Sequence, residues 1–370
     1  MRELVHLVNA GVPKIVVLSA MSGTTNALAE IAAALYAGEK ERANGSIAAL
    51  EQKYREVLAE LYSSENARGK GSELVSSSFK RLRSFAAGPF TVKEERAVLA
   101  LGEMLSTTLF QYHLEESKID STLLQALGFM RTGENEEPDL EYIETNFRKE
   151  LAKYPGGKLF ITQGYICRNA AGEIDNLKRG GSDYTATILG AAVRAEEIQI
   201  WTDIDGMHNS DPRIVEKTSP IAELSFDEAA ELAYFGAKIL HPTCILPAKT
   251  RNISVRLLNT LQPGAKGTLI SGKAAGDGIK AVAAKDGITA IKIKSGRMLL
   301  AYGFLRAVFE IFERYKTPID MIATSEVAVS LTIDDRKNLD AIVAELKGFC
   351  SVEVDSEQSI IWVVGSFTAQ

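Results

Sequence analysis

The sequence is poor in cysteine, lacks any long apolar run and has no large excess of charge of either sign. Its three cysteines, Cys167, Cys244 and Cys350, lie far apart and form no CxxC pair, which argues against a disulfide framework or a zinc site and indicates buried thiols. No apolar run approaches the ~20 residues that cross a bilayer, and the amino end lacks the order of a signal peptide, so we expect a cytoplasmic protein with no membrane partner. A net charge of -6 argues against nucleic acid as a partner.

The composition that remains is that of an ordinary globular protein, long enough for two domains. The chain has 370 residues, more than the ~250 to 300 at which single cores stop growing. Short runs rich in Val and Ile alternate with helical patterns, which predicts an α/β domain with a mainly parallel sheet sandwiched by helices. The predicted strands lie at residues 14–19, 158–163, 197–202 and 253–258, and the predicted helices at 93–116, 184–194 and 227–235.

The carboxyl-terminal part of the chain follows a different pattern. Residues 271–278, SGKAAGDG, have the composition of an interdomain linker and place a boundary near residue 270. Beyond it, the order strand, helix, strand, strand, helix, strand predicts a ferredoxin-like βαββαβ module. Its strands are expected at 289–294, 320–324, 327–332, 352–354 and 360–364, and its helices at 304–315 and 338–347.

The strongest functional motif is KRGGSDYT at residues 178–185, which opens into a helical pattern. Paired glycines let the backbone come close to a ligand, and the free N–H groups of a helix start attract an anion. Arg179 adds a planar, charged fork suited to a carboxylate or a phosphate. Taken alone, the motif is more often a turn followed by a helix cap.

A second group of motifs begins at the carboxyl end of a predicted strand, where α/β proteins bind ligands. WTDIDG at residues 201–206 leads to DPR at 211–213, and Lys238 follows in FGAKILHP. The first two also fit ordinary turns, and a lysine between a helix and a proline is normally a solvated surface charge. Near a nucleotide, Lys238 would instead be a compact charge for phosphate oxygens.

A third region of interest lies near the amino end, where the strand KIVVLS runs into AMSGTTN. The hydroxyls and backbone donors of this segment can form a ligand cradle, although a strand-to-helix connection with a capping residue explains the same pattern. Glu103, in LALGEMLSTTLF, is a carboxylate among small and apolar neighbours in a predicted helix. Such a side chain more often points outward.

The chain resembles the aspartate kinases of the amino-acid kinase family in six motifs that occur in the family's order. They are VVLSAMSGTTN, LGEMLST, FITQGYI, LKRGGSDYTA, IWTDIDGMHNSDPR and ELAYFGAKILHP. The module after residue 280 resembles the ACT domains with which such kinases sense end-product amino acids. The resemblance implies an amino-acid kinase catalytic domain over residues 1–270 and an incomplete ACT-like regulatory domain over residues 281–370.

The resemblance also implies roles for individual residues. Glu103 would hold the ammonium group of aspartate, and Arg179 a carboxylate. The family's other positions around the substrate are Ser19, Thr25, Tyr165, Ser182 and Asp183. Nucleotide contacts are implied for Thr202, Asp203, His208, Asp211, Arg213 and Lys238. Lys238, Arg179 and Asp183 would take part in catalysis. The implied effector site consists of Met298, Ala301, Gly303, Phe304, Leu305, Asp320, Thr324, Ser325 and Glu326.

The activity that the resemblance implies is transfer of the γ-phosphoryl group of ATP, with Mg²⁺, to the side-chain carboxylate of L-aspartate. The product, 4-phospho-L-aspartate, would feed lysine, threonine and methionine synthesis. An aspartate side chain has a pKa near ~3.9 and is already ionised at pH 7, so no general base is required. We expect feedback by lysine or threonine, a homodimer formed through the ACT region, and no resident metal site.

Departures from the family pattern leave alternatives open. The expected first strand ending in KFGGTS is absent, residue 1 corresponds to the helix after it, and the paired ACT region is incomplete; a tyrosine is common where this chain has His208. We therefore expect the chain as it stands to be nearly inactive. A catalytically impaired or mis-started copy of a kinase is one explanation, and an amino-acid-sensing regulatory subunit is another. A kinase for glutamate, acetylglutamate or UMP shares the GGSD turn, but the GE motif, WTDIDG and the ACT-like tail weigh against it.

Overall fold

A computed structural model of the protein describes residues 12–178, 180–235, 240–273, 276, 278–294 and 302–366. The chain separates into two compact units. The first unit comprises residues 1–207, 220–234 and 238–276, and the second comprises residues 208–219, 235–237 and 277–370. The second unit therefore takes in two short segments from within the range that we expected to form the kinase domain.

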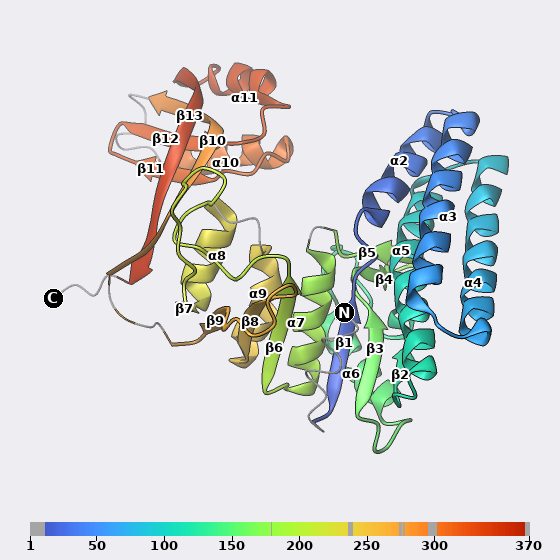
Figure 1. The fold of residues 1–370 in the computed structure, drawn as a ribbon. Coiled ribbons are helices and arrows are strands. Elements are labelled where there is room, and N and C mark those ends of the chain that lie inside the picture. The colour runs from blue at the N-terminus through green and yellow to red at the C-terminus, as the bar shows by residue number, and fades with distance from the viewer. Residues whose placement is uncertain are drawn as a thin grey trace. The chain divides into compact units, whose positions relative to one another are not determined.

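The helices and strands follow one another as in Figure 1. In chain order they are β1 (Lys14–Leu18), α2 (Thr24–Tyr36), α3 (Lys40–Leu61), α4 (Glu65–Ser84), η1 (Phe85–Ala87), α5 (Val92–Glu116), β2 (Thr122–Leu124), η2 (Ala126–Gly128), α6 (Leu140–Leu151), β3 (Leu159–Gln163), β4 (Ile166–Arg168), β5 (Ile174–Asn176), α7 (Gly181–Val193), β6 (Glu197–Thr202), β7 (Glu223–Ser225), α8 (Phe226–Phe235), α9 (Pro242–Arg251), β8 (Ser254–Asn259), β9 (Thr268–Ser271), β10 (Gly278–Lys294), α10 (Phe304–Arg314), β11 (Met321–Thr324), β12 (Ala328–Ile333), α11 (Leu339–Leu346) and β13 (Ser351–Ser366).

Strand β3 is the centre of the first unit. It pairs in parallel with β1 on one side and with β2 on the other, and all of its residues are buried. Leu159 and Ile161 pack with Phe110 of α5 on one face of the sheet, whereas Phe160 joins a core with residues of α6 and α7. Because successive side chains of a strand point to opposite faces of the sheet, this one apolar strand packs against helices on both faces. The predicted sandwich of a parallel sheet between helices is confirmed.

A second sheet of the first unit has the strand order β6-β8-β9-β7. Strands β6 and β8 are parallel, as are β7 and β9, while β8 and β9 are antiparallel. Helix α7 packs against both β1 and β6, so one helix covers the adjoining edges of the two sheets. The carboxyl ends of β1 and β6, followed by the loops that carry two predicted motifs, are thereby brought to the same helix.

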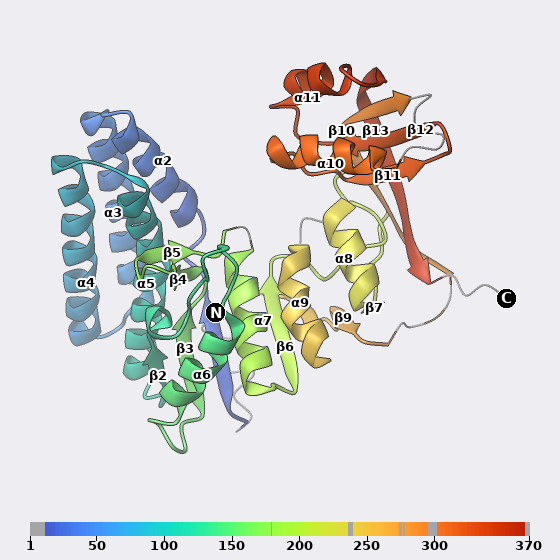
Figure 2. The same ribbon diagram turned by 180° about the vertical axis from the view of Figure 1, so that it is seen from behind.

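Helices α2, α3, α4 and α5 form a bundle beside the three-stranded sheet (Figure 2). Tyr54 of α3 and Phe79 of α4 are fully buried and meet edge to face, with ring centroids 5.7 Å apart. Apolar residues at three- and four-residue spacing, such as Ile47, Leu50 and Tyr54, direct one face of α3 into this core. None of the helices that the structure describes is long and apolar enough to cross a membrane.

The second unit is the predicted βαββαβ module. Its sheet has the order β11-β12-β10-β13, all antiparallel. Ile291 and Val329 on the sheet pack with Val308 of α10 and Ile342 of α11. The ferredoxin-like topology inferred from the order of elements is confirmed.

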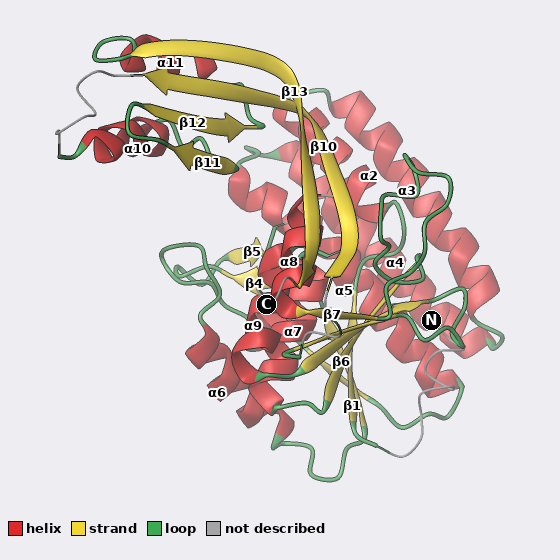
Figure 3. Cartoon of the chain, turned by 90° about the vertical axis from the view of Figure 1, so that its left-hand side faces the viewer, coloured by secondary structure: helices red, strands yellow, loops and turns green. Residues whose placement is uncertain are grey.

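One expectation for this module is wrong. The predicted strands at 352–354 and 360–364 are a single strand, β13, which pairs with β10 along nearly its whole length (Figure 3). The polar residues between the two predicted strands form an irregularity in the pairing instead of a turn. Its register shifts lie near Gly287 and Glu357, which have φ values of 75° and 56°. A bulge can absorb such residues without ending a strand.

Candidate active site

Helix α5 holds the loop of residues 19–23, which connects β1 to α2. The N–H of Ala20 donates to Oε1 of Glu103 at 3.2 Å, and Oγ of Ser106 donates to the carbonyl of the loop's first residue at 2.7 Å. Gly102 permits this approach, because a Cβ at its position would lie 2.8 Å from Cβ of Ala20. The GE pair of LGEMLST therefore has two tasks: the glycine allows the contact and the glutamate makes it.

Glu103 is a buried carboxylate with one unused oxygen. The residue is 3% exposed, and its Oε2 has no hydrogen-bond partner among the described residues. Burial raises the pKa of Glu103 to about 7, although the N–H of Ala20 acts in the opposite direction. The side chain thus points inward, unlike most helical glutamates. A buried carboxylate with a spare acceptor is suited to a cationic group of a ligand.

The turn after β3 packs directly against the start of α7. A Cβ on Gly164 would lie 2.5 Å from Oγ of Ser182, and one on Gly181 would lie 2.6 Å from the Tyr165 ring. Tyr165 has a φ of 65°, and its N–H donates to Oγ1 of Thr185 at 3.1 Å. Left-handed backbone at a residue with a side chain costs roughly 1–3 kcal/mol and persists only where surrounding contacts impose it. Such strain is often found at functional sites.

The acidic groups around this turn are shifted toward their neutral forms. Burial raises the pKa of Asp183 to about 6. Burial also raises the pKa of Tyr165 to about 12, with the charge of Glu103 as a weaker cause. Each ionised carboxylate would be stabilised by a positive group brought by a ligand.

Both α2 and α7 begin without a side-chain cap. Their N-cap residues are Gly23 and Gly180, with φ values of 76° and 67°. Within the described part of the chain, the N–H groups of Ser22, Gly23 and Thr25 have no acceptor. Open donors at a helix start attract anions, and the helix dipole adds to the attraction. The helix start predicted from KRGGSDYT is confirmed, since α7 begins at Gly181.

These segments border a cavity of about 500 Å³. It is lined by Ser22, Asp183, Ile200, Trp201, Thr202, Asp203, Thr260 and Leu261. At the end of β6, Oγ1 of Thr202 donates to Oδ1 of Asp203 at 3.0 Å. The cavity thus joins Asp183, predicted for the amino-acid side, to two residues predicted for the nucleotide side. Its volume is in the range of small-molecule sites.

Three predicted nucleotide residues belong to the second unit. Nδ1 of His208 lies 2.8 Å from Oγ1 of Thr218. Arg213 donates from Nε to Oδ1 of Asp211 at 2.9 Å, and from Nη2 to Oδ2 at 2.5 Å. The arginine and the aspartate of the DPR motif therefore form an ion pair with each other.

Some of the other residues predicted for the substrate and the nucleotide lie within the described part of the chain, and two lie outside it. Ser19, Tyr165, Ser182 and Asp183 lie in the loops and helix starts described above, and Glu103 lies within α5. Thr25 is exposed on the first turn of α2. Arg179 and Lys238 lie outside the described residues.

Comparisons with known proteins show the family of the chain. Residues 1–259 match the model of the amino acid kinase family. Lysine-sensitive aspartokinase 3 from Escherichia coli (strain K12) is 34% identical over 95% of this chain and 80% of its own length. The chain belongs to the aspartokinases of the amino acid kinase family.

Solved structures of aspartokinases show the same fold. The R-state crystal structure of E. coli aspartokinase III with aspartate and ADP has a TM-score of 0.82 and 32% identity, and the match covers 98% of this chain and 83% of that one. The T-state structure of the same enzyme with lysine and aspartate has a TM-score of 0.76 and 33% identity, with the same coverage.

The ACT-like module of this aspartokinase contains a buried acidic residue among those predicted for effector binding. The Asp320 side chain is 1% exposed, and Nζ of Lys285 lies 3.8 Å from its Oδ1. The N–H of Asp320 donates to the carbonyl of Thr332 at 2.9 Å, which fixes the start of β11. The partner Lys285 was not predicted from the sequence, because it lies on β10 and meets Asp320 only through sheet pairing.

The remaining effector predictions lie at the ends of α10 and β11. Gly303 precedes α10 with a φ of 87°, the ring of Phe304 packs 5.9 Å from that of Phe349, and Leu305 is 38% exposed. Thr324 is the exposed last residue of β11, and Ser325 and Glu326 lie in the exposed turn before β12, where the N–H of Ser325 donates to the carbonyl of Ala328. Met298 and Ala301 lie outside the described residues.

Several cavity residues of this aspartokinase were not predicted from the sequence. Thr260 and Leu261 follow β8, which neighbours β6. A signal was present, because residues 253–258 were a predicted strand and loops after parallel strands bind ligands. Leu261 is 78% exposed at the cavity, and an apolar side chain so placed gives no polar pattern to detect.

We predict that Gly102→Ala will destabilise the protein by about 1–3 kcal/mol, because the added methyl group meets another methyl group that has no rotamer with which to move away. Gly69 of α4 is a matched control, since a Cβ there meets nothing within 4 Å. Gly69→Ala should stabilise the protein by about 0.5–1 kcal/mol through helix propensity alone. Urea unfolding of both variants is the measurement. Equal effects of the two substitutions would show that the α5 contact is loose.

Proposed function

We propose that the cavity between the starts of α2 and α7 and the end of β6 binds L-aspartate and ATP for transfer of the γ-phosphoryl group to the aspartate side chain. The observation that supports this most directly is the buried Glu103, whose Oε2 is unused and whose Oε1 accepts the N–H of Ala20 in the loop that also carries the open N–H groups of Ser22 and Gly23. An amino acid carries one ammonium group and carboxylates, which are the charges that these two features select.

Within this proposal, Glu103 holds the aspartate ammonium group. The ionised form of Glu103 is disfavoured without ligand because the carboxylate is buried, and a bound ammonium group restores it. Aspartate binding near pH 7 should therefore release a fraction of a proton and weaken as the pH falls below the raised pKa.

We predict that Glu103→Gln will weaken aspartate binding and stabilise the empty protein at alkaline pH. The folded-state pKa, about 7, is above the ordinary value of 4.5, so the folded protein holds this proton more tightly than the unfolded chain. The resulting stabilisation is complete below pH 4.5 and is lost as the pH rises to about 7. Glutamine does not ionise, so the variant should exceed the wild type by about 1–3 kcal/mol at pH 8 and by much less at pH 5. Urea unfolding at both pH values is the test, and a difference independent of pH would contradict it.

Arg179 is proposed to bind a carboxylate of aspartate. Arg179 directly precedes in sequence the N-cap of α7, Gly180, and a guanidinium group is suited to a carboxylate.

We expect Arg179→Ala to raise the aspartate dissociation constant strongly and to leave ADP binding nearly unchanged. Loss of a charged hydrogen-bonding partner should cost on the order of 2 to 4 kcal/mol of binding free energy. Titration calorimetry with each ligand measures both effects. Arg194, which ends α7, offers a matched control, and an Arg194→Ala variant should bind aspartate as the wild type does. Unchanged aspartate affinity in Arg179→Ala would remove this assignment.

ATP is proposed to enter as its Mg²⁺ complex, with Thr202 and Asp203 at the cavity end of β6 and Lys238 near the phosphates. In this proposal Mg²⁺ enters with the nucleotide and neutralises charge on its phosphates. The charge of Lys238 would act mainly on the transition state, in which negative charge develops on the transferring group. We further propose that the enzyme acts in the cytoplasm.

The second unit is proposed to bind lysine or threonine as a feedback effector, in a homodimer formed through this unit. Asp320 is the buried acidic group that would take the effector's ammonium group, and the T state of the E. coli relative contains lysine. Coupling between effector and substrate sites is typically ~1–3 kcal/mol.

Calorimetry with lysine, threonine and methionine should detect binding of lysine or threonine, weakened about tenfold or more by Asp320→Asn. Asp334 is a control, because it also pairs with Lys285, at 2.7 Å, but is 43% exposed and lies outside the predicted effector set. Asp334→Asn should retain effector binding. Absence of heat with all three amino acids would disprove the site, and light scattering would test the dimer.

A further inference from the structure

Helix α3 also reaches the loop that holds the proposed substrate. Nζ of Lys53 donates to the carbonyl of Ser22 at 2.6 Å. The next residue, Tyr54, has its hydroxyl 3.3 Å from Oγ1 of Thr24, the first residue of α2. Two consecutive residues of one helix therefore hold the end of the 19–23 loop, while α5 holds its beginning.

We propose that Lys53 is a positioning residue for substrate binding, an inference that rests on the function proposed above. The carbonyl of Ser22 and the N–H of Gly23 belong to one planar trans peptide unit, in which the two groups point in opposite directions. When Lys53 fixes the carbonyl, it also fixes the direction of that N–H donor. Ser22 lines the 500 Å³ cavity, and the Gly23 N–H has no acceptor within the described part of the chain.

The bond made by Lys53 differs from the usual behaviour of an exposed helical lysine. Such a side chain ordinarily pairs with a carboxylate three or four residues away and contributes little. Lys53 instead reaches a backbone carbonyl 31 residues away in the sequence. Lys53 also lies against the loop at Gly23, where a Cβ would be 3.4 Å from Nζ, at ordinary contact distance.

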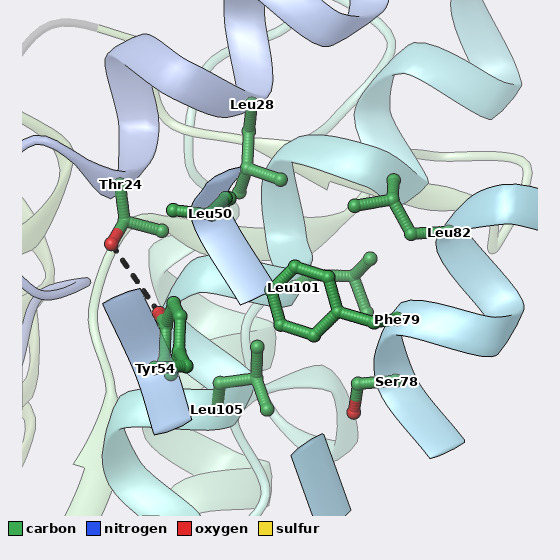
Figure 4. A pocket seen from close by; sticks show the side chains of 9 residues that line it. All are labelled: Thr24, Leu28, Leu50, Tyr54, Ser78, Phe79, Leu82, Leu101 and Leu105. Atoms are coloured by element: carbon green, nitrogen blue, oxygen red, sulfur yellow. Dashed lines mark hydrogen bonds between the residues drawn. The ribbon is translucent and has the colours of Figure 1, made fainter. Parts of the chain in front are cut away.

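Tyr54 holds this part of α3 in place next to the contact made by Lys53. Both Tyr54 and Thr24 are 0% exposed, and both line a small cavity of about 10 Å³ inside the bundle, where their hydroxyls face each other (Figure 4). Leucine and phenylalanine side chains form most of the remaining wall. The pair anchors the start of α2 in an apolar core, so the residue beside it in sequence, Lys53, acts on the loop from a rigid position.

The test compares Lys53→Met, Lys53→Arg and a control, Lys80→Met, which changes an exposed lysine of α4. Hydrogen exchange measured by mass spectrometry follows the amides of residues 19–25, and calorimetry gives the aspartate dissociation constant. Lys53→Met should speed exchange in this segment and weaken aspartate binding, each by roughly three- to tenfold, without changing exchange in the rest of the bundle. Lys53→Arg should retain most of both properties, and Lys80→Met should match the wild type.

Unchanged exchange in residues 19–25 of Lys53→Met would overturn the proposal, as would weaker aspartate binding that Lys53→Arg fails to rescue. Failure of the proposed function has a different signature. In that case neither the wild type nor any variant would bind aspartate. The hydrogen-exchange data would still decide whether Lys53 holds the loop.

Discussion

The geometry of the site depends on how α5 is seated between the strands. One turn apart on this helix, Glu103 accepts the N–H of Ala20 and Thr107 accepts Nε2 of Gln163, at 3.2 and 2.9 Å. The first contact fixes the loop after β1, and the second fixes the end of β3. Two turns earlier, Arg96 pairs with a carboxylate of β5 at 2.9 Å. One helix thus contacts the loop after β1, the end of β3 and β5, and it fixes their positions relative to each other. The loops that carry functional side chains are therefore held by a rigid part of the fold.

This arrangement sets stability against binding. The empty protein would be more stable with a neutral residue in place of the buried Glu103 carboxylate. Tyr165 is held in a left-handed backbone conformation by the packing of Gly181 against it. Both features cost free energy in the empty protein. Both also leave groups in place that a charged ligand can use without rearrangement, because the packing has already paid for their orientation.

The sequence predicts those parts of the molecule in which local pattern and tertiary environment agree. The apolar runs of β1, β3, β6 and β8 and the helix that starts at GGSD were identified because each carries its own periodicity or turn chemistry. The inward direction of the Glu103 side chain was not identified from the residue pattern, since a lone carboxylate in a helix gives no pattern that indicates which way it points. Lys53 was missed for a similar reason: only the folding of α3 against α2 brings it to Ser22. The irregular pairing near Gly287 hid the continuity of β13, because polar residues in a bulge have the composition of a turn.

The division of the chain into units does not follow sequence order. Residues 208–219 lie in sequence between β6 and β7 of the first unit, yet they belong to the second unit, where the N–H of Val282 on β10 donates to the carbonyl of Asn209 at 2.9 Å. This segment contains the DPR motif, whose arginine and aspartate are already paired with each other. It is joined covalently to the end of β6, where Thr202 and Asp203 line the cavity. The hydrogen bond from Val282 therefore fixes the DPR segment to β10 within the second unit. The position of this segment depends on a sheet that follows it by about sixty residues, so its assignment to the second unit could not be read from local sequence pattern.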